Sequence, residues 1–149
     1  SNENISDVMR VNFEAPVFLS QKLVKQKSFA KPSSIVFISS VSGVYVTYMA
    51  GSLYSASKGA INGMVKGIAL ELASKSIRVN SVNPAMVNTE ILSSGVIDEF
   101  QLKEDMKKYP LGRYGEPEEV AYAVIYLLSD ASAWVTGSNL LIDGGLTLQ

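Results

Sequence analysis

Apolar residues along the chain follow two different spacings. Three stretches carry them at the spacing of a helix: residues 5–27, 52–76 and the stretch that begins at Pro117. Three others are short apolar runs that indicate strands: residues 35–38, 77–82 and 139–142. The run at 35–38 is continuous and rich in β-branched residues, which is typical of a strand buried on both faces of a parallel sheet.

The order of these elements predicts the fold class. Helices and strands alternate along the chain, and no internal repeat is present. Such alternation produces a parallel sheet with right-handed crossovers and helices on both faces. We therefore predict an α/β fold, with a Ser/Gly-rich segment at 39–52 and a long loop with polar helical pieces at 85–115.

Two features predict departures from regular helical packing. Pro16 lies inside the helix at 5–27, where it should produce a kink or a local irregularity. Gly59, Gly63 and Gly67 line one face of the helix at 52–76, and each costs up to ~1 kcal/mol of helix stability. We expect the close approach of another backbone to offset that cost, within one chain or between two.

The composition excludes several classes of protein. The 149 residues have the length of one domain, and a content of 47% hydrophobic and 18% charged residues excludes a disordered chain. A net charge of −1 argues against a nucleic-acid or anionic-membrane surface. No apolar stretch approaches the ~20 residues of a bilayer span and the polar N-terminus lacks a signal pattern, so a cytoplasmic protein is expected. The absence of cysteine and histidine excludes thiolate and imidazole chemistry, and no metal site is predicted.

Tyr54 and Lys58 are the strongest local candidates for chemistry. They are four residues apart in a predicted helix, so the phenol and the ammonium project from the same face. A nearby ammonium stabilises a phenolate, and such a tyrosine can exchange a proton with a substrate oxygen. An ordinary exposed Tyr–Lys pair is the alternative for this motif taken alone.

Ser40 follows the run at 35–38, at the carboxyl end of the strand, where open α/β sheets place their ligands. Its hydroxyl can bond the same substrate oxygen as Tyr54. Ser39 and Ser42 flank it, and the alternative is that all three serines only terminate the strand.

Pro84 ends the next predicted strand, and the loop 85–89 after it lies over the same edge of the sheet. This loop offers backbone groups and the hydroxyl of Thr89 to a ligand. The alternative for Thr89 is the N-cap of a helix that begins near Glu90.

Six sequence features occur in order and cover nearly the whole chain: Asn12 in Val11-Asn12-Phe13, Ser40 in Ile38-Ser39-Ser40-Val41-Ser42-Gly43, Tyr54-x-x-x-Lys58, Asn83-Pro84, Pro110-Leu111-Gly112-Arg113-x-Gly115-x-Pro117-Glu118-Glu119-Val120-Ala121, and Thr136-Gly137-x-x-Leu140-x-Ile142-Asp143-Gly144-Gly145. Together they resemble the short-chain dehydrogenase/reductase family, most closely its 3-oxoacyl-[acyl-carrier-protein] reductase and glucose-dehydrogenase-like branch. The resemblance implies a partial doubly wound, Rossmann-like parallel sheet with helices on both faces.

The resemblance also implies an active site made of Asn12, Ser40, Tyr54 and Lys58. Tyr54 would exchange the proton with the substrate oxygen, and Ser40 would orient that oxygen. Lys58 would lower the pKa of Tyr54 and bond the ribose hydroxyls of the cofactor. Asn12 would hold a water through its backbone in a helix irregularity, for which Pro16 is suitably placed.

The implied cofactor is NADP or NAD, with the choice left open. Its nicotinamide end would contact five residues: Tyr54, Lys58, Pro84, Val87 and Thr89. The backbone of Val87 would meet the carboxamide, and Thr89 the carboxamide or the pyrophosphate. Ala85 departs from the family pattern, which usually has glycine after the proline, so we expect this loop to lie slightly differently over the nicotinamide.

The implied function is an NAD(P)-dependent oxidoreductase that interconverts a ketone and a secondary alcohol, a 3-oxoacyl thioester being one candidate substrate. Its implied partners are that small-molecule substrate and further copies of the chain, as a dimer or tetramer. In the family, the helices corresponding to 5–27 and 52–76 pair across a two-fold axis, and the last strand and its helix form a second interface. Six apolar residues predict a lid over the substrate: Ile91, Leu92, Val96, Ile97, Phe100 and Leu102.

The family holds the pyrophosphate with a Gly-rich strand–turn–helix, and this sequence contains no such motif. The spaced glycines Gly59, Gly63 and Gly67 cannot replace it, because they lie inside a predicted helix and not at the N-terminus of one. We therefore interpret residues 1–149 as a single C-terminal catalytic portion of such a domain, without its N-terminal dinucleotide-binding half. The alternative is an inactive remnant that serves only as a self-associating α/β module.

Overall fold

The computed structural model describes residues 2–89 and 98–148, which form a three-stranded parallel sheet in the order β1-β2-β3. Its strands are β1 (Ser33–Ile38), β2 (Ile77–Pro84) and β3 (Asn139–Ile142). In the parallel register, Ser33 pairs with Ile77 and Ser81 pairs with Asn139. The prediction of an α/β fold with a parallel sheet is confirmed.

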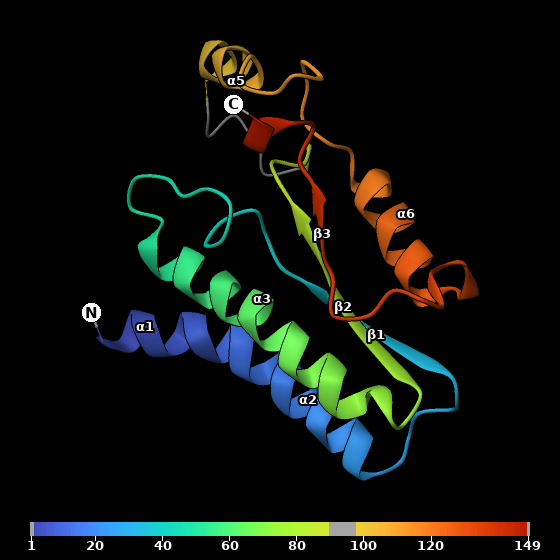
Figure 1. The fold of residues 1–149 in the computed structure, drawn as a ribbon. Helices are drawn as coiled ribbons and strands as arrows, with labels where there is room; N and C mark the ends of the chain where they lie inside the picture. Colours follow the sequence, from blue (N-terminus) through green and yellow to red (C-terminus); the bar gives the residue numbers. More distant parts are fainter. Residues whose placement is uncertain (1, 90–97, 149) are drawn as a thin grey trace.

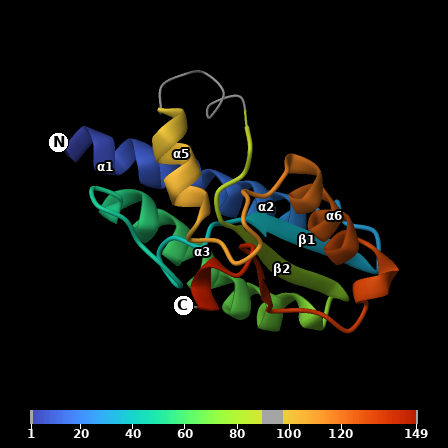
Figure 2. The ribbon, with the colours of Figure 1, turned by 90° about the horizontal axis from the view of Figure 1, so that it is seen from above.

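Helices cover the sheet on two sides (Figures 1 and 2). The bounds of the longer helices are α1 (Asn2–Met9), the π-helical η1 (Arg10–Glu14), α2 (Ala15–Lys25), α3 (Ser52–Ala73), α5 (Glu99–Met106) and α6 (Pro117–Leu128). Two short 3₁₀ turns complete the described elements: η2 (Asp130–Ser132) and η3 (Leu146–Leu148). In Figure 1 the segment from α1 to α2 forms one long rod beside α3.

Alternating side chains of the strands decide which helix covers which face. Phe37 of β1 and Val79 of β2 belong to the core cluster with α3, whereas Ser34 donates its hydroxyl to the carbonyl of Leu127 in α6, at 2.8 Å. Arg78 also reaches α6, donating to the same carbonyl at 2.9 Å. Because successive strand residues point to opposite faces, α3 and α6 pack on opposite sides of the sheet.

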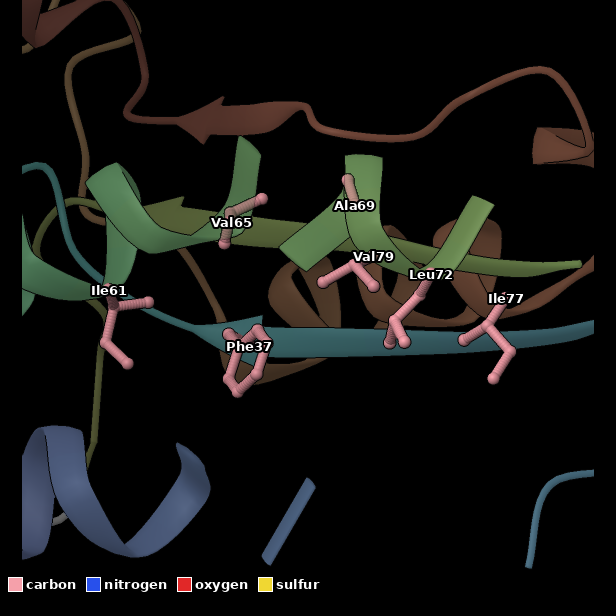
Figure 3. Packing of buried hydrophobic residues seen from close by; sticks show 7 residues of the cluster. All are labelled: Phe37, Ile61, Val65, Ala69, Leu72, Ile77 and Val79. Carbon is pink, nitrogen blue, oxygen red and sulfur yellow. The ribbon is translucent and has the colours of Figure 1, made fainter. Parts of the chain in front are cut away.

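The hydrophobic core lies between α3 and the sheet (Figure 3). Seven buried residues form it: Phe37, Ile61, Val65, Ala69, Leu72, Ile77 and Val79. Phe13 and Val24 pack against this cluster from the rod that runs beside α3. The core therefore fixes α3, which carries Tyr54 and Lys58, on both the sheet and the first helices.

The prediction that residues 35–38 are buried on both faces is wrong for this structure. Only Phe37 is buried, and Ile38 is 52% exposed. Within the described residues β1 has a single neighbour, β2, and so lies at an edge of the sheet. The strand buried along most of its length is β2, at the centre of the sheet. An apolar run indicates a strand but does not reveal its place in the sheet.

The predicted irregularity in the first helix is confirmed, and the structure locates it at η1. The N–H of Ala15 donates to the carbonyl of Arg10, five residues earlier, which is the bond of a π-helix. Pro16 has no N–H for the carbonyl of Asn12 four residues earlier, and its ring crowds that carbonyl. A wider turn at Asn12 is the physical consequence.

The close approach expected along the glycine face of α3 is found at Gly59 alone. A Cβ at Gly59 would lie 3.3 Å from the carbonyl oxygen of Gly43, whereas a Cβ at Gly63 or Gly67 would meet nothing within 4 Å. The expectation is therefore wrong for Gly63 and Gly67 within this chain.

Among the helices of the described residues, none has both the length and the apolar character needed to cross a bilayer.

Candidate active site

The candidate residues gather at the carboxyl edge of the sheet, beside a cavity of about 550 Å³. Ser40 after β1, Tyr54 in the first turn of α3, and Ala85 and Met86 after β2 all line this cavity. The N–H of Val41 donates to the carbonyl of Pro84 at 3.1 Å, which ties the ends of the two strands together. Residues far apart in the sequence thus face one space.

Tyr54 and Lys58 lie on the same face of α3, as their spacing predicts. The Nζ atom of Lys58 is 5.7 Å from the centre of the Tyr54 ring and donates to the carbonyl of Ile38 at 3.1 Å. Partial burial lowers the pKa of Lys58 from its ordinary value. Tyr54 is 36% exposed, so its phenol is accessible from the cavity.

Ser40 is buried but opens onto the same cavity as Tyr54. Its Oγ accepts the N–H of Ser42 at 3.1 Å, which orients the hydroxyl group at the end of β1. Ser39 has a different role, because its hydroxyl donates to the backbone carbonyl of Lys58 at 3.1 Å. Sequence reasoning placed both serines at the strand end but did not separate these two contacts.

Asn12 is connected to Tyr54 through a serine that the sequence analysis did not single out. The side-chain amide of Asn12 donates to Oγ of Ser57 at 3.0 Å, and Ser57 donates to the carbonyl of Tyr54 at 2.7 Å. Ser57 is fully buried. A side-chain hydrogen bond therefore joins the π-helical turn that contains Asn12 to α3, at the residue directly before Lys58.

The loop after β2 brings Pro84, Val87 and Thr89 to this edge. Pro84 ends β2, and Val87 forms an isolated parallel bridge with Gly115. Thr89 is exposed at the end of the first described stretch. Its alternative role as an N-cap concerns Glu90, which lies outside the described residues.

Tyr109, Asp105 and Lys108, which were not identified from the sequence, also line the cavity, and Tyr114 supports them from behind. Tyr109 packs edge-to-face on Tyr114 with ring centres 5.4 Å apart, and Tyr114 donates its hydroxyl to Asp105 at 2.9 Å. Asp105 also pairs with Lys108 at 2.6 Å. Burial raises the pKa of both tyrosines, so they remain protonated hydrogen-bonding groups near neutral pH. In the sequence, the one feature that could have indicated this group is the position of Tyr109 directly before the Pro110–Ala121 motif.

The predicted apolar lid falls mostly outside the described residues, which exclude Ile91, Leu92, Val96 and Ile97. Phe100 is exposed on α5, and Leu102 is half-buried there. No group of three or more acidic side chains that could hold a metal ion occurs in residues 2–89 and 98–148.

The segment before α6 carries a forked ion pair between Arg113 and Glu119. Both guanidinium nitrogens donate to the carboxylate at 2.7 Å, and the N–H of Glu116 donates to the same carboxylate at 2.7 Å. These donors lower the pKa of Glu119 to about 2. The carboxylate therefore stays ionised at neutral and mildly acidic pH.

We expect Glu119 to contribute to acid sensitivity. Because its pKa is lower in the folded state, its stabilising effect is present above the ordinary value of 4.5 and is lost as the pH falls towards about 2. Because the pair is exposed, the difference in urea unfolding between the wild type and Glu119→Gln should be small, largest near neutral pH and absent in acid, with Glu104→Gln, which removes the carboxylate of another exposed ion pair, as the control. A difference that stays constant with pH would contradict this assignment.

The chain is similar to proteins of known family and known structure. The model of the family described as enoyl-(acyl carrier protein) reductase matches residues 1–147. A tropinone reductase homolog of Arabidopsis thaliana is 40% identical over 147 residues, which cover 99% of this chain and 54% of that protein. The chain thus spans about half the length of that curated relative.

Two solved structures superpose on the whole chain. A short chain dehydrogenase family protein from Francisella tularensis subsp. tularensis SCHU S4 has a TM-score of 0.89 and 34% identity, with 64% of that chain covered. A 4-hydroxyisoleucine dehydrogenase complexed with NADH has a TM-score of 0.88 and 34% identity, with 61% of that chain covered.

Proposed function

The chain belongs to the short-chain dehydrogenase/reductase family, and from this membership we propose that it carries the proton-transfer and nicotinamide-facing part of an oxidoreductase that interconverts a ketone and a secondary alcohol. The observation that carries the proposal is the shared cavity of Ser40 and Tyr54, with Lys58 beside the tyrosine. The chain has neither histidine nor cysteine, so the phenol of Tyr54 is the side chain best suited to exchange a proton there.

In ketone reduction, Tyr54 would donate its phenolic proton to the carbonyl oxygen, and in alcohol oxidation it would accept that proton. Ser40 would hold the same oxygen by a hydrogen bond, since its hydroxyl faces the same cavity. The ammonium of Lys58 would stabilise the phenolate that forms when Tyr54 gives up its proton. The nicotinamide, when bound, supplies or takes up the hydride at carbon.

The donor groups at this edge suit the nicotinamide end of NAD or NADP. The ammonium of Lys58 has three N–H donors, and within the described residues one of them is directed at the carbonyl of Ile38, which leaves capacity for ribose hydroxyls. The backbone of Val87 and the hydroxyl of Thr89 follow β2 at the same edge. These residues would hold the nicotinamide and its ribose, with Thr89 at the carboxamide or the pyrophosphate, and no Gly-rich phosphate-binding motif occurs in the sequence.

The cavity favours a substrate that is largely apolar around its carbonyl group. Asp105, Lys108 and Tyr109 line part of this cavity, and five further residues give it apolar surface: Val41, Val46, Tyr48, Met86 and Leu146. Such a wall suits acyl chains or alicyclic ketones, and a 3-oxoacyl thioester is one candidate. The volume of about 550 Å³ is in the range of small-molecule sites.

A second candidate function is self-association without turnover. Exposed apolar side chains along the rod and α3 favour it, with Val11 68%, Phe18 62% and Leu70 80% exposed. Exposed apolar side chains on neighbouring helices can form an interaction surface where they are contiguous. A dimer or tetramer is compatible with both functions.

A fluorescence titration of the purified chain with NADH and with NADPH separates the two functions, with the oligomeric state measured by light scattering on the same sample. We expect saturable binding with a higher Kd in Lys58→Met. The cofactor with the lower Kd is the one that the chain prefers. With that cofactor, the chain should reduce ketones, and the rates measured for ketones with apolar groups of increasing size test the substrate class. A stable oligomer with no binding at millimolar cofactor would contradict the enzyme function of this chain and support self-association.

A further inference from the structure

The motif Pro110–Ala121 has no part in the proton transfer described above, yet it is joined to the loop after β2. The N–H of Gly115 donates to the carbonyl of Met86 at 3.0 Å, and the N–H of Asn88 donates to the carbonyl of Gly115 at 2.7 Å. These two bonds form the isolated bridge between Val87 and Gly115. Val87, the residue assigned to the carboxamide, is thus held from both sides by one glycine.

Gly115 is itself fixed by its neighbours in the chain. Arg113 binds Glu119 through two hydrogen bonds of 2.7 Å and also donates to the carbonyl of Tyr114 at 2.9 Å. Glu119 accepts the N–H of Glu116 and completes a capping box at the start of α6. The residues on either side of Gly115 are therefore both tied to the Arg113–Glu119 fork.

A third tie comes from side chains. The side-chain amide of Asn88 donates to both carboxylate oxygens of Glu116 at 3.4 Å. The N–H of Met86 donates to the hydroxyl of Tyr109 at 3.4 Å. Contacts on Met86, Val87 and Asn88 thus all lead to the segment 109–119.

We propose that the Arg113–Glu119 ion pair is a latch that positions the loop 85–89, so that Arg113 and Glu119 are positioning residues for the nicotinamide. The consequence for the cofactor rests on the proposed function, whereas the latch itself does not. Met86, Val87 and Asn88 lie outside any regular strand, so the bridge to Gly115 is what sets their place.

The exposure of the pair favours positioning over stability. The side chains of Arg113 and Glu119 are 51% and 40% exposed, and ion pairs in such surroundings contribute little to global stability. A forked guanidinium–carboxylate contact nevertheless fixes direction as well as distance. A displacement of ~1 Å in a group that positions a reactant can cost ~100-fold in rate, so a small stabilising effect and a large functional effect are compatible.

The other role open to Glu119 is that of a helix cap alone. Two variants separate cap from latch. Glu119→Gln keeps a capping residue at the third helical position, because glutamine also reaches back to the N-cap, but it removes the charge of the fork. Arg113→Met leaves Glu119 as the cap and removes its partner. Lys107→Met, in the exposed pair with Glu104, is the matched control.

Amide hydrogen exchange measured by NMR tests directly whether the ion pair stabilises the backbone bonds between Gly115 and the loop 85–89. In Arg113→Met and Glu119→Gln, the amides of Asn88 and Gly115 should exchange ~10-fold faster or more, while amides in the middle of β2 keep their protection. The double variant Arg113→Glu with Glu119→Arg should restore part of that protection. Lys107→Met should leave all of these amides unchanged.

A titration with NADH on the same samples tests the consequence for the cofactor. The Kd should rise ~10-fold in both latch variants, fall again in the charge-swapped double variant, and stay unchanged in Lys107→Met. Unchanged protection of Asn88 and Gly115 in Arg113→Met would overturn the latch, as would a loss of protection shared equally by β2. If the wild type binds no cofactor, the proposed function fails, and the exchange rates alone then support or overturn the latch.

Discussion

Tyr54→Phe is expected to lower the kcat of ketone reduction by about 10²–10⁴-fold, the usual contribution of a positioned general acid or base. The phenyl ring keeps the shape of the side chain, so the packing at the start of α3 remains. Only the hydroxyl, which opens onto the cavity shared with Ser40, is lost. The measurement is the initial rate of NADH or NADPH oxidation at saturating ketone.

The cofactor Kd of Tyr54→Phe should change far less than kcat, since binding the nicotinamide also depends on Lys58 and on the loop 85–89. Tyr48→Phe is the matched control, because it removes a phenolic hydroxyl from another residue that lines the same cavity, whereas the ring that the Lys58 ammonium contacts is that of Tyr54. Its rate should stay near that of the wild type. A Tyr54→Phe variant with an unchanged rate would contradict the assignment of the proton to this residue.

The sequence predicts elements well where a local signal decides the structure. Apolar spacing predicted α3, and Pro117 with two acidic residues after it predicted the start of α6, because helix N-termini favour both. Pro16 predicted an irregular helix, since a missing N–H is a local property. These features require no knowledge of what packs against them.

Features set by distant neighbours were missed or wrongly predicted. The exposure of Ile38 follows from the position of β1 at the sheet edge, which the apolar run alone does not reveal; the interpretation of the chain as a C-terminal portion does predict an exposed, apolar edge at 34–40. Gly63 and Gly67 look like Gly59 in sequence, yet only Gly59 has a backbone opposite it. The spacing of residues shows which of them share a helix face, whereas the segment that packs against that face is determined by the rest of the fold.

The candidate site shows the same division. Spacing along one helix joined Tyr54 with Lys58, and the rule on strand ends joined Ser40 to them. The contact between Asn12 and Ser57 is a side-chain bond between two helices, and the fork of Arg113 and Glu119 acts on a loop more than twenty residues away in the sequence. Such pairs have no periodicity, so only the structure reveals them.

The turn after β1 approaches α3 so closely that Gly43 has no room for a side chain. Gly43 has a φ of +94°, in the region that favours glycine. An added Cβ would overlap the carbonyl oxygen of Ser55 and lie 2.9 Å from the nitrogen of Gly59. Both are backbone atoms of the helix that carries Tyr54 and Lys58, so neither can move without shifting those side chains.

Gly43→Ala is therefore expected to lower the free energy of unfolding by about 3 kcal/mol or more, from backbone strain together with overpacking. Gly63→Ala is the matched control: it places the same methyl group on α3 where nothing lies within 4 Å, and it should raise the free energy of unfolding by up to ~1 kcal/mol. Urea unfolding followed by circular dichroism measures both. Where Gly43→Ala still folds, Tyr54 should be displaced, and a displacement of ~1 Å can lower the rate ~100-fold. Equal stability of the two variants would show that the turn moves away from α3 without cost, whereas destabilisation by Gly63→Ala with loss of oligomers would place a second chain on that face.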